Sequence, residues 1–291
     1  MHYEGDIIRP PSEADSILLQ VTVGCSHNKC TFCPTYKNKR FKIKDDAIIE
    51  ADLDFAARYC QRQTRLFFCD GDALIIPQKR LVAILQTIRE KLPWVRRISS
   101  YANTKGIRMK TEEELTELKE LGLTLLYMGL ESGDDQTLAE IKKGADAARM
   151  IECGKKVKKL GMKLSITVLL GIAGDDPAKS LAHARATGEV LSAIDPDFVG
   201  ALTIMVVPGT PLYEAQRRGE WHLPEPLEML AELREMIAHT NLSSGLFYAN
   251  HASNYLPIKA RLPKDKAATL ALIDQALAGQ VRLKPEYMRA L

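Results

Sequence analysis

The stretch that decides the fold is Ser16-Ile-Leu-Leu-Gln-Val-Thr-Val-Gly-Cys25-Ser-His-Asn-Lys-Cys30-Thr-Phe-Cys33. Its first part, Ser16–Val23, is apolar and β-branched and breaks at Gly24, which predicts a buried strand. Its second part places three cysteines within nine residues, with four residues between the first two and two between the last pair. A buried strand therefore leads directly into a loop rich in thiols.

The pattern of a strand followed by a helix recurs along the chain. Further strands are predicted at Arg65–Cys69, Arg97–Tyr101, Thr124–Gly129, Lys163–Leu170 and Phe198–Val207. Apolar residues at helical spacing predict helices at Asp45–Gln61, Gln78–Leu92, Thr111–Leu121 and Ala178–Ile194, with more helical segments before Leu160. Strands that alternate with helices indicate an α/β fold with a parallel sheet and crossover helices.

The pattern changes near Leu212, which suggests a domain boundary. Beyond it the sequence predicts a helix at Pro224–Thr240, an irregular stretch at Asn241–Pro263 and a last helix at Lys264–Ala278. We therefore expect an α/β domain at 1–211 and a C-terminal helical and irregular extension at 212–291 that packs on it and closes the active site. Six strands are too few for an eightfold barrel, which leaves an open, partial barrel or a doubly wound sheet. In either fold the binding site lies at the carboxyl ends of the strands.

The composition is that of an ordinary soluble, folded chain. Of the 291 residues, 46% are hydrophobic and 26% are charged, and the net charge is +3. So small a net charge gives no reason, by itself, to expect a nucleic-acid partner. The first residues carry acids unlike a secretory signal, and the longest apolar stretch, around Leu164–Ala173, falls short of the ~18 residues that cross a bilayer. We expect a cytoplasmic protein with no membrane partner.

The clustered cysteines predict a metal centre, because disulfide scaffolds belong to small, secreted, cysteine-dense chains. Zinc would need a fourth ligand, and His27 inside the loop would reach the same ion only under strain. An iron–sulfur cluster accepts all-cysteine ligation, and an incomplete set leaves one iron open to another ligand. Both remain open at this point. The other cysteines stand apart in patterns typical of buried, inert thiols: Cys60, Cys69 and Cys153.

The thiol loop resembles that of the radical S-adenosylmethionine (SAM) superfamily. Cys25, Cys30 and Cys33 follow the first strand as that family's cluster ligands do, and Phe32 matches its aromatic residue before the last cysteine. The first gap is longer than in the most common family spacing. The resemblance implies a partial (β/α)6 barrel, a [4Fe–4S] cluster held by the three cysteines, and SAM bound at the open iron.

Later segments extend this resemblance. Asp70-Gly71-Asp72 looks like the family's Gly-Gly-Glu segment for the SAM amino group, and a common Asp-Gly turn is the alternative. Tyr127-Met-Gly-Leu-Glu-Ser-Gly133 is similar to a stretch in the branch with methylthiotransferases and oxygen-independent coproporphyrinogen oxidases, which implies that Glu131 contacts SAM. Lys143 would bind the SAM carboxylate, or else be a solvated lysine at a helix end. The candidate cofactor-binding residues are Phe32, Gly71, Asp72, Ser100, Asn103, Glu131, Lys143 and Gly171.

The implied activity is reductive cleavage of SAM to a 5′-deoxyadenosyl radical that abstracts hydrogen from a substrate. A compact, weakly charged chain favours a small-molecule substrate, and His251 and Tyr255 are candidates for a substrate or proton role. The basic run Lys37–Lys44 would meet a flavodoxin or ferredoxin-like electron donor, or would be a solvated basic edge. Two other classes stay open: a radical SAM enzyme that modifies RNA, which would need a stronger basic face, and a non-catalytic iron–sulfur or zinc protein.

Overall fold

The computed structural model describes residues 1–290, and these form two compact units. The first unit comprises Met1–Asn28, Thr35–Met128 and Lys156–Leu164. The second comprises Lys29–Pro34, Gly129–Lys155 and the chain from Ser165 onward. The chain therefore crosses between the units several times, and each unit is described below by itself.

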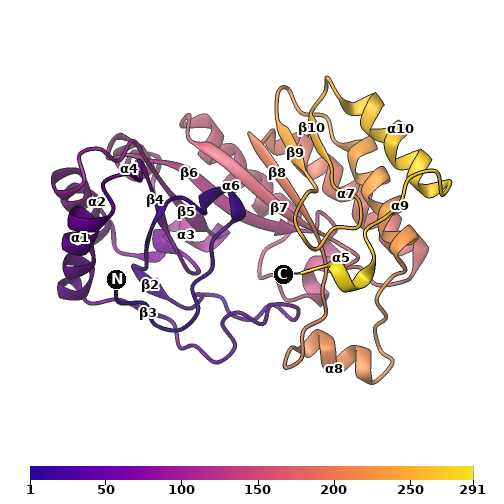
Figure 1. Ribbon diagram of the computed structural model, residues 1–291, viewed down its shortest axis with the longest axis horizontal. Helices are drawn as coiled ribbons and strands as arrows, with labels where there is room; N and C mark the ends of the chain where they lie inside the picture. The colour runs from indigo at the N-terminus through magenta and orange to yellow at the C-terminus, as the bar shows by residue number, and fades with distance from the viewer. Residues whose placement is uncertain (291) are drawn as a thin grey trace. The chain divides into compact units, whose positions relative to one another are not determined.

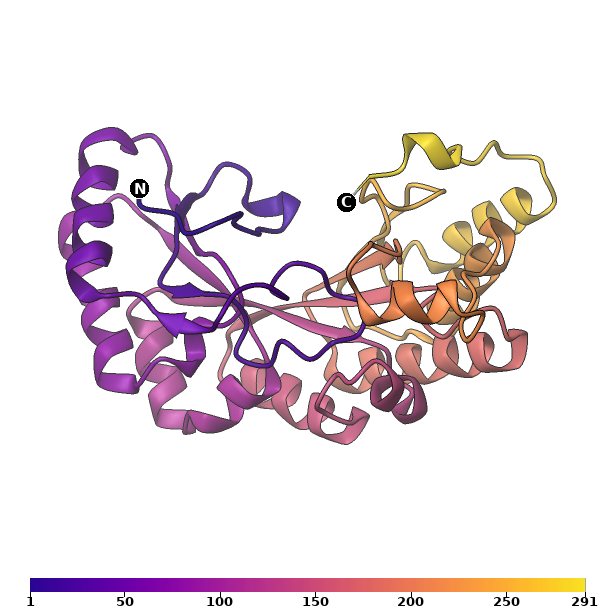
Figure 2. The same cartoon turned by 90° about the horizontal axis from the view of Figure 1, so that it is seen from below.

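The first unit contains parallel strands covered by helices. Its strands pair in the order β1 (Ile17–Leu19), β4 (Arg65–Phe68), β5 (Arg97–Ala102) and β6 (Leu123–Glu131), and β6 continues into the second unit at Gly129. Its helices are α1 (Asp46–Tyr59), α2 (Gln78–Lys91), α3 (Thr104–Met109) and α4 (Glu112–Glu120). Figure 2 shows α1 and α2 along one face of these strands, while the part of the N-terminal segment around residues 11–13 lies on the other face. A separate antiparallel pair is formed by β2 (Thr22–Val23) and β3 (Lys42–Ile43).

The N-terminal segment is anchored to the free face of this sheet by a buried carboxylate. Glu13, in the short 3-10 helix η1 (Pro11–Glu13), is fully buried. It accepts hydrogen bonds from Arg97 Nη2 at 2.7 Å, Ser99 Oγ at 3.0 Å and Tyr127 Oη at 2.7 Å. Because a buried carboxylate is costly unless it is paired and hydrogen-bonded, these three donors on β5 and β6 fix η1 against the strands.

The second unit contains β7 (Lys163–Leu170), β8 (Phe198–Thr203) and β9 (Leu246–Tyr248), which pair in parallel, and β10 (Lys259–Arg261), which pairs antiparallel with β9. Figure 1 labels its helices α5 (Asp135–Glu140), α7 (Pro177–Ile194), α8 (Pro211–Arg217), α9 (Pro226–His239) and α10 (Lys266–Leu277). α6 (Ala147–Lys159) and β7 both cross from one unit to the other. α7 and α9 pack closely against one another, and α10 packs on α9.

Each unit has its own apolar core. In the first, Leu66, Phe67 and Phe68 of β4 are completely buried. In the second, one cluster joins α5, the carboxyl ends of β7 and β8, and α8 through Leu138, Ile141, Leu169, Ile172, Ile204 and Leu212. Truncating such side chains to alanine costs about 2–5 kcal/mol, so these cores hold the strand ends in place. Within residues 1–290, no helix is both long and apolar enough to span a membrane.

The α/β class and its parallel strands confirm the prediction, with three local corrections. The single strand expected at Ser16–Val23 is two short strands, because Gln20 and Val21 separate β1 from β2 and only β2 pairs with β3. The strand expected at Phe198–Val207 ends at Thr203. The stretch Asn241–Pro263, expected to be irregular, contains the β9–β10 pair. The boundary between residues 211 and 212 stays a prediction.

Candidate functional site

The thiol loop follows β2, and all six cysteines are thiols without disulfide bonds. Gly24 adopts a φ of 77°, a left-handed conformation that glycine tolerates best, and turns the chain out of the sheet towards Cys25. Cys25 belongs to the first unit, and Cys30 and Cys33 belong to the second. All three are partly exposed. Of the isolated cysteines, Cys69 and Cys153 are buried as predicted, whereas Cys60 is only half-buried at the end of α1, so its predicted burial is wrong.

Gly71 lies against the backbone of the thiol loop in the first unit. Its amide donates to the carbonyl of Gly24 at 3.0 Å. A Cβ at Gly71 would lie 2.5 Å from the Gly24 carbonyl oxygen and 2.6 Å from Cys25 Cα. Only glycine fits so close a backbone approach, so the turn after β4 determines where the loop begins.

Asp72, which follows Gly71 in this turn, is fully buried and connects the turn to Ser26 and, through Ser26, to Asn103. Ser26 Oγ donates to Asp72 Oδ2 at 3.3 Å, and Asn103 Nδ2 donates to Ser26 Oγ at 3.0 Å. Asp72 Oδ1 has no hydrogen-bond partner in the described chain. Burial raises the pKa of Asp72 to about 7, although the hydrogen bond from Ser26 opposes the shift. The site thus holds a carboxyl group that a cationic partner would ionise.

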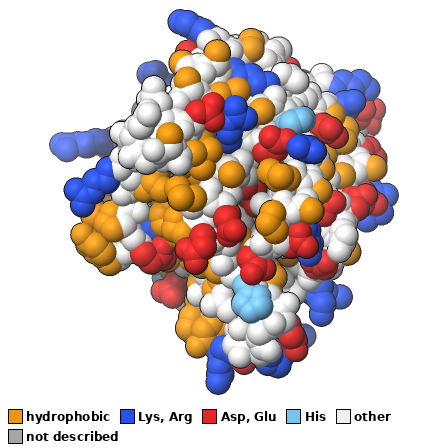
Figure 3. All heavy atoms as spheres, turned by 90° about the vertical axis from the view of Figure 1, so that its right-hand side faces the viewer, with side chains coloured by type: hydrophobic (Ala, Val, Ile, Leu, Met, Phe, Trp, Pro, Cys, Tyr) orange, Lys and Arg blue, Asp and Glu red, His pale blue; other side chains and the backbone are white. Residues whose placement is uncertain are grey.

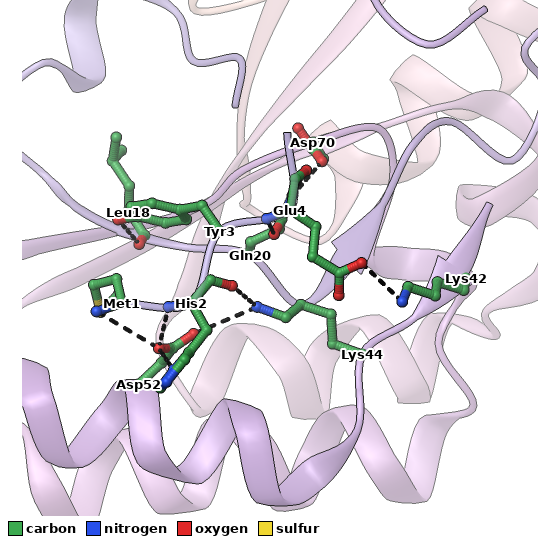
Figure 4. Close-up of polar contacts among 10 residues, drawn as sticks. All are labelled: Met1, His2, Tyr3, Glu4, Leu18, Gln20, Lys42, Lys44, Asp52 and Asp70. Carbon is green, nitrogen blue, oxygen red and sulfur yellow. Dashed lines mark hydrogen bonds and ion pairs between the residues drawn. The ribbon is translucent and has the colours of Figure 1, made fainter. Parts of the chain in front are cut away.

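Asp70 stands where the family pattern has glycine, and it adopts a φ of 68°. Gln20 Nε2 donates to its Oδ2 at 2.7 Å, and Gln20 Oε1 accepts from the amide of Glu4 at 2.9 Å (Figure 4). Burial raises the pKa of Asp70 as well. These contacts explain why an aspartate occupies a left-handed position: its carboxylate joins the turn to β1 and to the N-terminal segment.

Ser100 and Asn103 lie at the carboxyl end of β5 and serve local structure. Ser100 is buried, and its hydroxyl donates to the carbonyl of Tyr101 at 2.7 Å. Asn103 caps α3 by accepting from the amide of Gly106 at 2.9 Å. Asn103 Nδ2 also donates to Ser26 at 3.0 Å, so the structure brings Asn103 together with Asp72 through one shared serine.

In the second unit, the last part of the thiol loop is fixed by backbone bonds. The amide of Thr31 donates to the carbonyl of Ile141 at 3.0 Å, and its carbonyl accepts from the amide of Leu212 at 3.0 Å. The ring of Phe32 packs against the apolar cluster at the carboxyl ends of β7 and β8, which includes Leu169 and Ile204. Phe32 therefore anchors the residues between Cys30 and Cys33.

Glu131 and Lys143, expected separately as SAM contacts, form an ion pair at the end of β6. Lys143 Nζ lies 2.9 Å from Glu131 Oε1, and the two side chains are only 15% and 11% exposed. Glu131 adopts a φ of 65°, which turns its carboxylate back beside the strand. A Cβ at Gly129 would lie 2.2 Å from Glu131 Oε1 and 3.0 Å from Lys143 Nζ. Gly129 thus makes room for this pair.

Gly171 begins the turn after β7 with a φ of 78°. Its amide donates to Glu232 Oε1 at 2.7 Å, and a Cβ there would lie 2.8 Å from Met229 Sδ. The backbone of this turn is therefore held from behind by α9. Glu232 and its neighbour His183 on α7 were not among the residues predicted from the sequence. Polar residues at core-facing helical spacing were the signal that could have found them.

The segment from His251 to Tyr255 lies at the carboxyl end of β8. Ser253 Oγ accepts from the amide of Thr203 at 3.2 Å, and Thr203 Oγ1 donates to Asn254 Oδ1 at 2.9 Å. His251 Nδ1 is 2.9 Å from Ser253 Oγ, and burial, followed by the charge of Lys284, lowers its pKa.

Tyr255 is more tightly held than His251. Its hydroxyl donates to Glu286 Oε2 at 2.5 Å, and the guanidinium of Arg289 lies 4.3 Å from its ring centroid. Burial raises the pKa of Tyr255 to about 12. Arg289 also donates to the carbonyls of Ser253 at 2.7 Å and Ile204 at 2.9 Å, which makes it the residue that fastens this segment to β8.

Much of the basic run Lys37–Lys44 bonds within the first unit. Figure 4 shows Lys44 pointing to Asp52 and to the carbonyl of His2; its Nζ lies 3.5 Å from Asp52 Oδ2 and both side chains are fully buried. Lys42 pairs with Glu4 at 2.8 Å. The run is therefore not simply a solvated basic edge, and Arg40 and Lys42 are its exposed cations.

The donor set fits an iron–sulfur cluster. Cys25, Cys30 and Cys33 are partly exposed thiols on one loop, and Gly71 lets the turn after β4 pack directly against the backbone of Cys25. No three His, Cys, Asp or Glu side chains of residues 1–290 are close enough together to hold a single metal ion. A four-iron cluster has different needs, because each thiolate binds a different iron.

Comparisons with known proteins identify the class. The chain matches the model of the radical SAM superfamily over residues 19–184. It is 24% identical to an uncharacterised protein of Methanocaldococcus jannaschii, over 86% of this chain and 75% of that protein. The heme chaperone HemW of Bacillus subtilis is 22% identical, over 59% of this chain and 44% of its own length. Coproporphyrinogen III oxidase (HemN) from Escherichia coli has a similar fold, with a TM-score of 0.55 at 17% identity, over 77% of this chain and 51% of that one.

The chain belongs to the radical SAM superfamily, whose model matches more than half of its length. It is therefore an enzyme of a family that binds a [4Fe–4S] cluster and SAM. The similarity to HemW supports the predicted branch. The partial-barrel fold class is confirmed by the likeness to HemN. The chain spans about half the length of HemN and less than half that of HemW, so the activities of those whole proteins are not carried over to it.

Proposed function

We propose that this chain cleaves SAM reductively and uses the resulting radical on a small-molecule substrate. The observation that carries the proposal is the thiol loop itself, with Cys25 placed by its contact with Gly71 and Phe32 anchored between Cys30 and Cys33. When bound there, the reduced cluster and SAM supply a 5′-deoxyadenosyl radical that abstracts a hydrogen atom. The chain's own residues bind, orient and shield these groups.

In this proposal Cys25, Cys30 and Cys33 ligate the cluster, and two groups of residues hold SAM. In the first unit, Gly71 holds the turn against Cys25, and Asp72 offers a buried carboxyl oxygen without a hydrogen-bond partner among residues 1–290, which suits an ammonium group. Ser100 and Asn103 line the end of the neighbouring strand, where a ribose would find hydroxyl and amide partners.

In the second unit, the Glu131–Lys143 pair presents both signs of charge in a partly desolvated place. An amino acid moiety carries an ammonium and a carboxylate, so it is complementary to such a pair. Phe32 gives apolar surface for the rest of the cofactor, which would also lie against the turn at Gly171 that α9 holds from behind.

The substrate would lie against His251 and Tyr255. Their segment is fastened to the carboxyl end of β8 by Thr203 and Arg289, so His251 is held in place for a substrate or proton role, while the contacts of Tyr255 favour an orienting role. A small molecule is favoured over RNA because the net charge is only +3 and the face in Figure 3 carries acidic and basic side chains interspersed with hydrophobic ones.

The electron donor we propose is a flavodoxin or ferredoxin-like protein. Acidic donors dock on basic surfaces, and the exposed cations nearest to the cysteines in sequence are Lys29 and Arg40. Six thiols without a disulfide support a cytoplasmic location, where thiols stay reduced.

The proposal is tested by anaerobic reconstitution with iron and sulfide, followed by dithionite and SAM. We expect iron–sulfur absorbance and release of 5′-deoxyadenosine, which liquid chromatography measures. C30A removes one proposed ligand and should abolish both signals. C153A removes a thiol that is 1% exposed in the second unit and should keep them, apart from a modest loss of stability. Equal loss in both variants would contradict the ligand assignment, and zinc without iron would favour the non-catalytic alternative.

A further inference from the structure

A series of buried polar groups in the second unit runs behind the turns that follow β6 and β7. His183 of α7 and Glu232 of α9 are both 0% exposed. Neither belongs to the thiol loop or to the residues proposed to hold SAM. A buried ionisable pair is costly to desolvate, and replacement by apolar residues is often neutral or stabilising. The buried pair of His183 and Glu232 is therefore better explained by a role in the site than by a gain in stability.

On one side, His183 holds the turn after β6. His183 Nδ1 lies 2.7 Å from the hydroxyl of Ser132, the residue that directly follows Glu131. The next amide, that of Gly133, donates to Thr187 Oγ1 at 2.8 Å, and Thr187 lies one helical turn after His183 on α7. A Cβ at Gly133 would lie 2.3 Å from the carbonyl oxygen of Ala186. The turn carrying Glu131 is thus seated directly on α7.

On the other side, Glu232 holds the turn after β7. Its Oε1 accepts from the amide of Gly171 at 2.7 Å, and its Oε2 accepts from Ser180 Oγ at 2.5 Å. The amide of Gly171 begins a left-handed turn and points away from the strand ladder, so a side chain must satisfy it. Glu232 supplies this acceptor from α9.

The two sides meet where His183 Nε2, a buried atom without a hydrogen-bond partner in the described chain, faces Glu232 Oε1 at 3.4 Å. We propose that His183 and Glu232 are positioning residues that couple the turn at Ser132 to the turn at Gly171, and that this coupling sets the affinity for SAM. The inference rests on the proposed function, which assigns Glu131 and Gly171 to SAM. The coupling itself is a property of the protein alone, because every contact in it joins the chain's own residues.

The coupling is tested first without any cofactor, by amide hydrogen exchange of the full chain. E232L removes the acceptor of the Gly171 amide and the neighbour of His183, so exchange should become faster both at 170–175 and at 131–135. E232Q keeps a carbonyl oxygen for Gly171 and should restore the protection of both turns. T240V is the matched control: Thr240 is the buried residue that caps the C-terminus of the same helix, its hydroxyl donates to the carbonyl of Met236, and both turns should exchange as in the wild type.

A change confined to 170–175 in E232L would overturn the coupling, because the turn after β6 would then be independent of Glu232. If E232L does not fold, S132A addresses the same link from the other end. It removes the partner of His183 Nδ1, and exchange at 170–175 should rise together with exchange at 131–135. A change at 131–135 alone would again overturn the proposal.

The effect on SAM is measured by calorimetric titration of the cluster-loaded chain. The Kd should rise by about tenfold in E232L, stay near the wild-type value in E232Q, and not change in T240V. A lower melting temperature of E232L with an unchanged Kd would reduce the pair to a structural role. If the wild-type chain binds no SAM, it is the proposed function that fails, and the exchange experiment still decides the coupling.

Discussion

The two units differ in whether the buried carboxylates in and around their candidate SAM residues already have hydrogen-bond partners. In the first unit, Asp70 and Asp72 each keep one buried carboxyl oxygen without a hydrogen-bond partner among residues 1–290. In the second unit, the carboxylates have partners, since Lys143 binds Glu131 and Glu232 accepts two hydrogen bonds, although the nearby His183 Nε2 makes no hydrogen bond within residues 1–290. A ligand would add contacts in the first unit, whereas it must compete with existing ones in the second. The contribution of the second unit to SAM affinity thus depends on how strongly Glu131 and Lys143 already bind each other.

The largest effect on stability and iron content is expected from G71A, because its new side chain would clash with the backbone of the thiol loop. G71A would place a Cβ 2.5 Å from the carbonyl oxygen of Gly24 and 2.6 Å from Cys25 Cα, so the thiol loop has to shift. We expect a loss of at least about 2 kcal/mol in the free energy of unfolding, as in overpacked cores, and a marked loss of bound iron. Urea denaturation and iron analysis measure both.

The matched variant is G129A in the second unit. Its Cβ would meet the ends of the Glu131 and Lys143 side chains, and both of these can rotate away. We expect less than about 1.5 kcal/mol of destabilisation and normal iron content, but weaker SAM binding because the pair is displaced. Normal iron content in G71A together with lost iron in G129A would contradict the expectation that Gly71, and not Gly129, determines the position of the thiol loop.

A smaller effect is expected when the charge pair of the second unit is broken. K143M leaves the Glu131 carboxylate, which is 11% exposed, without the ammonium at 2.9 Å and removes the cation proposed for the SAM carboxylate. The Kd for SAM should rise by roughly tenfold, the value of one charge-assisted hydrogen bond. K142M is the control, since it removes the same charge from the exposed neighbour and should leave the Kd unchanged. Similar losses in the two variants would show that Lys143 acts only through the net charge.

The strands and most of the individual site residues could be predicted from the sequence, whereas the contacts between those residues could not. The strands Arg65–Cys69 and Lys163–Leu170 were found because buried strands in parallel sheets are continuous apolar runs. Glu131 and Lys143 were each singled out, yet their pairing depends on the left-handed turn at Glu131 and on the space at Gly129, which no periodicity reveals. His183 and Glu232 were missed because buried polar residues on an apolar helix face resemble breaks in its pattern.

The smallest expected effect is a pH dependence of stability that comes from the raised pKa of Asp72. Its ordinary pKa of 3.8 is raised by burial to about 7, so between these values the folded, SAM-free chain holds a proton that the unfolded chain has lost. The folded state then binds more protons, and the contribution of Asp72 to stability falls as the pH rises from about 4 to about 7. D72N lacks this titration and should show no such loss over the same window.

An ammonium group at Asp72 favours the ionised carboxylate, so SAM binding should expel that proton. Titration calorimetry at pH 6.5, in two buffers with different ionisation enthalpies, should show the release of roughly half a proton or more per SAM in the wild type. D72N should bind more weakly and release none, and the affinity of the wild type alone should rise as the pH approaches 7. Equal proton release in both would mean that Asp72 only holds Ser26 and Asn103 together and does not contact the ammonium group of SAM.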